Sequence, residues 1–182
     1  MINSLLLIIY NWFRIAFGKL FHPGRYRVHW IQRISPKCAL KVYDKGTLEI
    51  GRNCDIPPYC DLEVHRKGTL KIGNGCCFNR FVMISVQESV TIGDRCMIAP
   101  GVKIFDNSHQ YTPENGVNQE LTTAPISIGN GCWLCSNVVV LKGARIGNNC
   151  VIGAGCVVRE DIPDGTVLTV RQEKTLRKGE AR

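Results

Sequence analysis

One histidine of this chain occurs where a regular repeat breaks off. His109 follows a run of evenly spaced aliphatic residues, and His22, His29 and His65 are not at metal-ligand spacing from it. Imidazole titrates near neutral pH, so a histidine that a scaffold holds open to solvent can act as a general base. The alternative is an ordinary surface histidine. Its position at the break favours the general base.

The elements around His109 follow a six-residue repeat. Six copies carry isoleucine, then glycine, with cysteine four places after the isoleucine: Ile50/Cys54, Ile72/Cys76, Ile92/Cys96, Ile128/Cys132, Ile146/Cys150 and Ile152/Cys156. Ile34/Cys38 and Ile56/Cys60 keep this spacing without the glycine. Such a rhythm is typical of an all-β solenoid, a parallel β-helix. We expect the aliphatic side chains to point inward and the glycine to supply backbone freedom at a tight corner.

The register predicts about six coils of three short strands each. Ile128 and Ile146 are 18 residues apart, which is one coil, whereas Ile92 and Ile128 are 36 residues apart. The extra length, residues 107–125, lacks the aliphatic rhythm and is predicted to be an extruded loop, a type of segment that often carries function. The expected domains are a helix and lead-in over residues 1–33, the β-helix over 34–165 and a basic tail over 166–182.

Eight of the ten cysteines occupy the small-residue slot of the repeat. Stacked inward thiols behave as small hydrophobic groups, so we interpret them as reduced core residues. Cys77 and Cys135 lie outside the slot and are expected to be reachable from solvent. The sequence shows neither a signal-peptide cleavage pattern nor zinc-type histidine spacing, which predicts a cytoplasmic protein without a metal site.

The net charge of +8 gathers in residues 14–33 and 171–182. No basic stripe with aromatic or motif support accompanies it, so a nucleic-acid partner is not expected. The basic ends could face anionic lipid or a phosphorylated cofactor. Solvated surface charge is the alternative.

The first twenty residues combine apolar and basic side chains. An apolar run over residues 5–10 is followed by Trp12, Phe13 and Phe17, with Arg14 and Lys19 inserted. This pattern predicts an amphipathic helix, because a spanning helix needs ~20 mostly apolar residues. The helix could lie at a membrane interface, on the inner face of the cell membrane, or pack on the solenoid or a partner subunit. A spanning helix is the third alternative.

Three further elements make the pattern more specific. They are Val90-Thr-Ile-Gly-Asp with His109 nineteen residues after Val90, Pro125-Ile-x-Ile-Gly-Asn-x-x-Trp133 with Ser136-x-Val-Val, and Ile152-Gly-Ala-Gly. Together they resemble the hexapeptide-repeat acyltransferases, most of all the galactoside and maltose O-acetyltransferase branch. The resemblance covers residues 72–163. It implies a left-handed β-helix, a homotrimer whose sites lie between subunits, and acetyl-CoA as co-substrate without a metal.

The resemblance also implies roles for single residues. His109 matches the general base, and Asn79 matches an asparagine that holds the acceptor. Gln87 stands where the family has an acidic acceptor-binding residue. The positions implied to bind acetyl-CoA are Trp133, Ser136 and Ala154 along its pantetheine arm, Arg159 where the family usually has threonine, and Lys174 and Arg177 near its phosphates.

The predicted function is transfer of acetyl from acetyl-CoA to a sugar hydroxyl. The basic, apolar N-terminus favours a lipid-linked acceptor, such as a capsule or O-antigen precursor, over a small free saccharide. An antibiotic or free-sugar acetyltransferase is the alternative within this class. An inactive assembly scaffold is a second alternative, because Gln87, Arg159 and Glu160 depart from the family pattern. A carbonic anhydrase of this fold would need three histidines on adjacent coils, which His65 and His109 do not supply.

Overall fold

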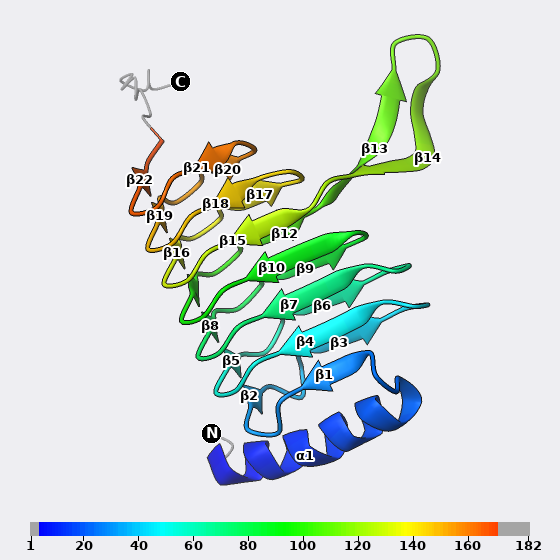
Figure 1. Cartoon of the computed structure of the whole chain (residues 1–182), viewed down its shortest axis with the longest axis vertical. Coiled ribbons are helices and arrows are strands. Elements are labelled where there is room, and N and C mark those ends of the chain that lie inside the picture. Colours follow the sequence, from blue (N-terminus) through cyan, green and yellow to red (C-terminus); the bar gives the residue numbers. More distant parts are fainter. Residues whose placement is uncertain (1–3, 171–182) are drawn as a thin grey trace, which may run out of the picture.

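The computed structural model describes residues 4–170, which form a parallel β-helix with one helix at its N-terminal end (Figure 1). Three parallel sheets form the sides of a prism, two of seven strands and one of six. This arrangement makes six complete coils and a seventh coil of two strands. The predicted solenoid of about six coils is therefore confirmed.

Each sheet takes one strand from every complete coil. Sheet A comprises β1 (Tyr26–Val28), β4 (Thr47–Ile50), β7 (Thr69–Ile72), β10 (Ser89–Ile92), β15 (Ile126–Ile128), β18 (Arg145–Ile146) and β21 (Asp161–Ile162). Sheet B comprises β2 (Arg33–Ile34), β5 (Asp55–Ile56), β8 (Cys77–Phe78), β11 (Met97–Ile98), β16 (Trp133–Leu134), β19 (Val151–Ile152) and β22 (Val167–Leu168). Sheet C comprises β3 (Ala39–Val42), β6 (Asp61–Val64), β9 (Met83–Val86), β12 (Lys103–Phe105), β17 (Val139–Leu141) and β20 (Val157–Val158).

The strand register matches the six-residue repeat. In sheet A, Ile50 pairs with Ile72, which pairs with Ile92, and Ile92 pairs with Ile128 across the 36-residue step. These side chains are at most 3% exposed and form one column of the core. The first coil already includes β1, which pairs with β4, so the β-helix begins before residue 34, where we expected it to start.

The corner between sheets A and B carries a ladder of asparagine and aspartate side chains. Asn74 Oδ1 accepts the backbone N–H of Arg52 at 3.0 Å, and Asp94 Oδ1 accepts that of Asn74 at 2.7 Å. The contact recurs in the later coils at Asn130, Asn148 and Asp164. Each coil thus satisfies a backbone donor of the coil before it.

The glycine of the repeat makes room for this ladder. A Cβ at Gly51 would lie 2.7 Å from Asn74 Oδ1, and one at Gly93 would lie 2.6 Å from Asn130 Oδ1. The left-handed backbone of this corner falls two residues later, as at Asn53 with φ of 57°. The expectation that the glycine supplies backbone freedom is therefore wrong, because close approach of the next coil is what excludes a side chain there.

The cysteines stack inside the prism. Cys96 Sγ donates to the Gly129 carbonyl at 3.1 Å, and Cys132 Sγ donates to the Gly147 carbonyl at 2.9 Å. A thiol is small enough for the corner and also donates to a carbonyl of the next coil, which alanine could not do. The predicted burial is confirmed for all eight slot cysteines: Cys38, Cys54, Cys60, Cys76, Cys96, Cys132, Cys150 and Cys156.

The two cysteines outside the slot differ from these eight. Cys77 is exposed and Cys135 is half-buried, as predicted. Cys132 and Cys135 stand at C-x-x-C spacing, a pattern that can indicate a redox or metal site. Both are free thiols, and Cys132 points into the core.

The helix α1 (Ser4–Phe21) lies across the N-terminal end of the coils (Figure 1). Asn11 Nδ2 donates to the Ile34 carbonyl at 3.0 Å, and the Arg14 guanidinium donates to the carbonyls of Ser35 and Cys38 at 3.2 and 2.7 Å. In the described part of the chain no coil precedes the first one to donate to these carbonyls, and α1 donates to them instead. The predicted helix is confirmed, and one of its faces packs on the solenoid.

The opposite face of α1 is apolar and open to solvent. Phe13 is 74% exposed, Leu20 is 73% exposed and Trp12 is 50% exposed. Within residues 4–170, no helix has both the length and the apolar character that crossing a membrane requires. Exposed aromatic rings on a helix that is already anchored by its other face indicate a surface for a partner or an interface.

We expect a thiol reagent to label the native protein quickly only at Cys77 and Cys135, because the other eight cysteine side chains are buried and the reagent cannot reach them. Burial raises the pKa of Cys38 to about 12 and also raises the pKa of Cys60. Mass spectrometry of peptides after a short reaction in mildly alkaline buffer would identify the labelled residues. All ten cysteines should react in denaturant. Rapid labelling of Cys96 in the native protein would contradict the inward slot.

Candidate functional site

The segment that interrupts the repeat is a β-hairpin rather than an irregular loop. It consists of β13 (Asn107–Thr112) and β14 (Gly116–Thr123), which pair in antiparallel fashion. The hairpin leaves the solenoid at the end of β12, at the corner between sheets C and A, and projects away from the coils (Figure 1). Pairing within the segment satisfies its backbone groups, although its sequence lacks an aliphatic rhythm.

The base of the hairpin is held by Asp106, which is 0% exposed. Its carboxylate accepts the backbone N–H of Gln87 at 2.9 Å and those of Glu88 and Ser89 at 2.8 Å each. Asn107 Nδ2 adds a further donor at 3.0 Å. These contacts tie the start of the hairpin to the preceding coil. Sequence analysis missed Asp106, although an acidic residue directly before the break in the repeat was a signal for it.

His109 lies on β13 opposite Leu121 and is exposed. Its Nδ1 is 3.2 Å from the Asn118 carbonyl of β14. A carbonyl can only accept, so in the neutral imidazole this contact places the proton on Nδ1 and the lone pair on Nε2. The register of the hairpin shifts between His109 and Tyr111, and bulges of this kind re-aim neighbouring side chains. The geometry thus presents Nε2 as a proton acceptor.

The two residues expected to bind the acceptor lie at opposite ends of β9. Asn79 is exposed at the corner between sheets B and C. Gln87 is half-buried at the corner between sheets C and A, next to Asp106. Gln87 Oε1 is buried without a hydrogen-bond partner among the described residues. Gln87 therefore shares its corner with the base of the His109 hairpin, whereas Asn79 does not.

Two of the residues expected to bind acetyl-CoA stack at the corner between sheets B and C. Gly155 donates its backbone N–H to the Ser136 carbonyl at 3.0 Å, which places Ala154 next to Ser136 on the following coil. The backbone N–H groups of Ser136 and Ala154 donate to no acceptor within residues 4–170. Trp133 lies on β16, with its ring 48% exposed on the outside of sheet B.

The basic residues expected near the cofactor phosphates are only partly described. Arg159 is exposed at the corner that follows β20, where its backbone N–H donates to Glu160 Oε2 at 3.0 Å. Lys174 and Arg177 lie outside the described residues. Across residues 4–170, no three His, Cys, Asp or Glu side chains gather closely enough to hold a metal ion.

The expected site residues therefore form two groups on opposite edges of sheet C. One edge carries Asn79, Ser136 and Ala154, and the other carries Gln87, Arg159 and the root of the hairpin that presents His109. Because β12 pairs in parallel with β17, the corner before β17 aligns with the start of β12 and the hairpin with its end. The full width of sheet C lies between the two groups within one chain.

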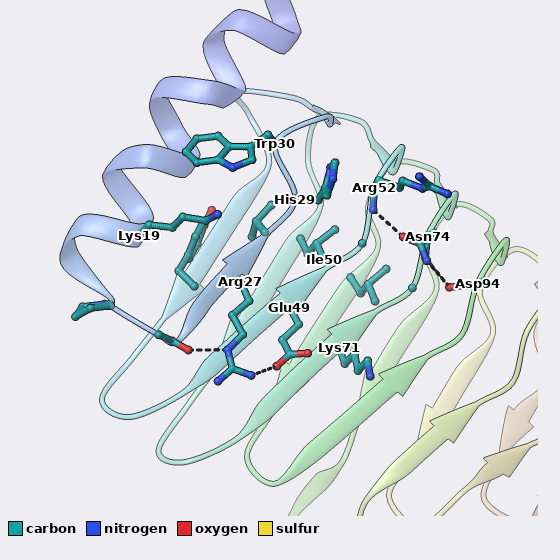
Figure 2. Close-up of a pocket in the computed structure, with 17 residues that line it drawn as sticks. Lys19, Arg27, His29, Trp30, Glu49, Ile50, Arg52, Lys71, Asn74 and Asp94 are labelled. Carbon is teal, nitrogen blue, oxygen red and sulfur yellow. Dashed lines mark hydrogen bonds and ion pairs between the residues drawn. The ribbon is translucent and has the colours of Figure 1, made fainter.

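A groove that sequence analysis did not predict lies on the lower coils. It has a volume of about 940 Å³ and runs from the end of α1 over the first coils of sheet A (Figure 2). His109 and Ser136 are not among its lining residues. The labelled side chains include Lys19, Trp30 and Arg52. A histidine and a tryptophan at positions 29 and 30, where the third to sixth coils have glycine and asparagine or aspartate, were a signal for it.

Comparison with known proteins adds to this geometry. Residues 125–160 match the family model of the bacterial transferase hexapeptide (six repeats). The galactoside O-acetyltransferase of Escherichia coli K12 is 46% identical over 79 residues, which are 43% of this chain and 39% of that protein. The putative lipopolysaccharide biosynthesis O-acetyl transferase WbbJ of the same strain is 38% identical over 109 residues, 55% of this chain and 56% of the relative. The chain thus spans about half or less of these relatives.

A solved structure extends the likeness to the fold. The hexapeptide-repeat acetyltransferase VCA0836 of Vibrio cholerae O1 biovar eltor, solved in complex with acetyl coenzyme A, superimposes with a TM-score of 0.57. It is 28% identical in sequence, and the match covers 65% of this chain and 63% of that one. The similarity therefore spans most of the coils and does not depend on a single hexapeptide.

We expect Asp106→Ala to lower the free energy of unfolding by about 2–4 kcal/mol, because three backbone N–H groups lose a charged acceptor. Asp106→Asn keeps one acceptor oxygen and should lose less. Urea denaturation followed by circular dichroism would measure both. Glu120→Ala, an exposed carboxylate on the same hairpin, is the matched control and should change stability by less than about 0.5 kcal/mol. Equal losses for Asp106→Ala and Glu120→Ala would contradict the anchoring role.

Proposed function

Because this chain belongs to the hexapeptide-repeat transferase family, we propose that it is an acetyl-CoA-dependent O-acetyltransferase that acts on a sugar hydroxyl. The observation that carries the proposal is the presentation of His109 on an anchored hairpin, with Nδ1 bound to a carbonyl and Nε2 open. The two E. coli relatives, named as a galactoside and a lipopolysaccharide O-acetyltransferase, support the reaction class.

In the proposed reaction, His109 Nε2 accepts the proton of the acceptor hydroxyl while the hydroxyl oxygen attacks the thioester carbon of acetyl-CoA. The C–S bond then breaks, and the departing sulfur takes the proton from the imidazolium. The products are an acetyl ester and free CoA. Histidine suits both transfers because its pKa lies near the working pH. The intermediate oxyanion requires N–H donors that are already in position.

The edge that carries Ser136 and Ala154 is proposed to bind the pantetheine arm. The backbone N–H groups of Ser136 and Ala154, which are unpaired within residues 4–170, lie on successive coils, so they can reach successive carbonyls of an extended arm. Trp133 provides an exposed aromatic wall on the adjoining sheet. We further propose that Arg159, Lys174 and Arg177 contribute positive charge near the phosphates of CoA.

We propose that the active site is shared between subunits of a homotrimer. Within one chain, His109 and the edge of Ser136 and Ala154 are separated by sheet C. Prisms packed side by side would bring the edge of one chain against the opposite edge of its neighbour. A cyclic trimer closes this head-to-tail arrangement and builds three equal sites. The acceptor would then lie between Asn79 of one chain and the hairpin of the next.

The acceptor is proposed to be a precursor of a cell-surface polysaccharide, such as a capsule or O-antigen sugar. Gln87 stands in place of an acidic residue, which argues against the simple sugar recognition of the galactoside enzymes. The likeness to WbbJ supports the same class. A free-sugar acetyltransferase is the second candidate, because the galactoside relative has the higher identity. CoA release that a free galactoside stimulates better than any polysaccharide precursor would favour the second candidate.

We also propose that the protein works in the cytoplasm in peripheral contact with the inner face of the membrane. The solvent-facing rings of α1, among them Trp12 and Phe13, could enter the boundary between headgroups and acyl chains. The buried face of α1 caps the first coil, so deletion of the helix would expose the prism end. Contact is better tested by polar substitutions on the exposed face than by removing the helix.

We expect His109→Ala to lower kcat by about 10²–10⁴-fold, because the variant loses the group that accepts the proton. Affinity for acetyl-CoA should change little, since the cofactor edge is intact. A continuous assay of CoA release and an equilibrium binding titration would measure the two quantities. His65→Ala is the control and should keep its activity, because His65 stacks on Tyr43 beside the lower coils.

Two outcomes would count against this role. Equal loss of acetyl-CoA binding or of folded protein in His109→Ala would mean that His109 is structural. Undiminished CoA release would mean that another group is the base. Absence of acceptor-dependent CoA release in the unaltered protein, across free sugars and polysaccharide precursors, would favour an inactive assembly scaffold.

A further inference from the structure

The first two coils lack the small residues that form the ladder at the corner between sheets A and B. The third to sixth coils place asparagine or aspartate after the corner glycine, beginning with Asn74. The equivalent positions of the first two coils hold Trp30 and Arg52, and the glycine position of the first coil holds His29. Three large side chains therefore replace small ones on adjoining coils.

The physical reason for this exception is the end of the ladder. Gly51 is excluded from carrying a side chain because Asn74 Oδ1 would lie 2.7 Å from its Cβ. In the second coil, Arg52 stands where the third coil has Asn74. An arginine side chain has no oxygen atom that could fill the space next to position 29. Position 29 is thus released from the constraint, and His29 and Trp30 can face solvent beside α1 (Figure 2).

These side chains line a groove that carries excess positive charge. Lys19, Arg27, Arg52 and Lys71 line it, against the carboxylates of Glu49 and Asp94. Arg27 is bound to Glu49 at 2.9 Å, and Asp94 accepts from Asn74, so both carboxylates are engaged. Within residues 4–170, Arg52 and Lys71 have no carboxylate within 4.0 Å. Their charges are therefore available to an anionic group.

An apolar slot of about 440 Å³ adjoins the basic groove. Trp12, Phe13, Ala16 and Trp30 line it, and Trp30 also lines the groove. Lys19 Nζ lies 4.3 Å from the centre of the Trp30 ring, which joins the cationic and apolar parts. The site thus has a place for a negative charge and a place for a hydrocarbon within one contiguous surface.

We propose that this groove and slot bind an anionic phospholipid at a bilayer surface. The phosphate lies near Lys19, Arg52 and Lys71, and the start of the acyl chains lies against Trp12, Phe13 and Trp30. Tryptophan prefers the headgroup boundary, and each basic residue adds attraction to anionic lipid. The proposal rests on the membrane contact proposed above and names the residues that recognise the lipid.

A bilayer fits this surface better than a second copy of the chain. The slot lies between Trp12, Phe13 and Ala16 of α1 and Trp30 of the corner after β1. The helix α1 itself lies at the N-terminal end of the solenoid (Figure 1). Side-by-side packing of prisms would use their sheets and edges and would leave this end free. The phosphates of anionic lipids can form ion pairs with Arg52 and Lys71 of the groove.

The test is co-flotation of the full chain with vesicles of equal parts phosphatidylglycerol and phosphatidylcholine. We expect the double variant Arg52→Gln/Lys71→Gln to bind about 30-fold more weakly, from ~1 kcal/mol for each basic residue near anionic lipid. Arg145→Gln, an exposed arginine of sheet A three coils beyond Lys71, is the control and should bind as the unaltered protein does. Trp30→Ala should weaken binding to the same vesicles.

Three results would overturn the proposal. The first is equal flotation of the double variant and the Arg145→Gln control. The second is displacement of the protein from vesicles by inorganic phosphate at matched ionic strength, which would mean that the groove takes a soluble phosphate. The third is a lack of flotation together with self-association that Trp12→Ser/Phe13→Ser abolishes, which would make a second copy the occupant.

Flotation is independent of catalysis, so the two proposals can fail separately. CoA release with a free saccharide is measured on the same preparations. Charge-dependent flotation of a protein that transfers no acetyl group would leave the lipid site standing and remove the proposed function. Acetyl transfer by a protein whose flotation does not change when Arg52 and Lys71 are substituted would leave the proposed function standing and remove the lipid site.

Discussion

Each coil of this solenoid completes hydrogen bonds of the coil before it, and the rest of the structure depends on that constraint. The side-chain ladder that begins at Asn74 caps a backbone N–H one coil away, and the thiol of Cys96 serves a carbonyl of the next coil. A coil without a neighbour, or with an interruption, leaves such groups without the partner that the next coil would supply. At the open end of the first coil, Asn11 and Arg14 of α1 donate to its carbonyls. At the interruption, Asp106 accepts the backbone N–H groups of the preceding coil.

The same constraint determines where chemistry can occur. Inside the regular coils the inward positions are filled by core side chains, so large departures from the repeat occur at the ends and at the interruption. The hairpin that presents His109 interrupts the repeat after β12, at one edge of sheet C. The edge with Ser136 and Ala154 is across the sheet, which makes the site incomplete in a single chain. The groove of His29, Trp30 and Arg52 occupies the end of the ladder, where the demand for small residues is lifted.

The coils were predictable because a six-residue period and an inward slot leave only one arrangement of the aliphatic residues. The burial of the cysteines followed from that register. Sequence analysis did not find the role of Asp106, because three N–H groups meet on one carboxylate only after residues 87–89 and 106 are brought together by the fold. It also misread the corner glycine, since the clash with Asn74 Oδ1 comes from the next coil and is invisible along the chain.

The central claim is that His109 of one chain works with the Ser136–Ala154 edge of another. His109→Ala and Ala154→Trp each remove one half of the site, so each variant alone should be inactive. Co-refolding equal amounts should restore about one quarter of the unaltered activity, because a random trimer pairs an intact hairpin with an intact edge at that frequency. Activity that stays at the level of the separate variants, in mixed trimers verified by mass spectrometry, would contradict the claim.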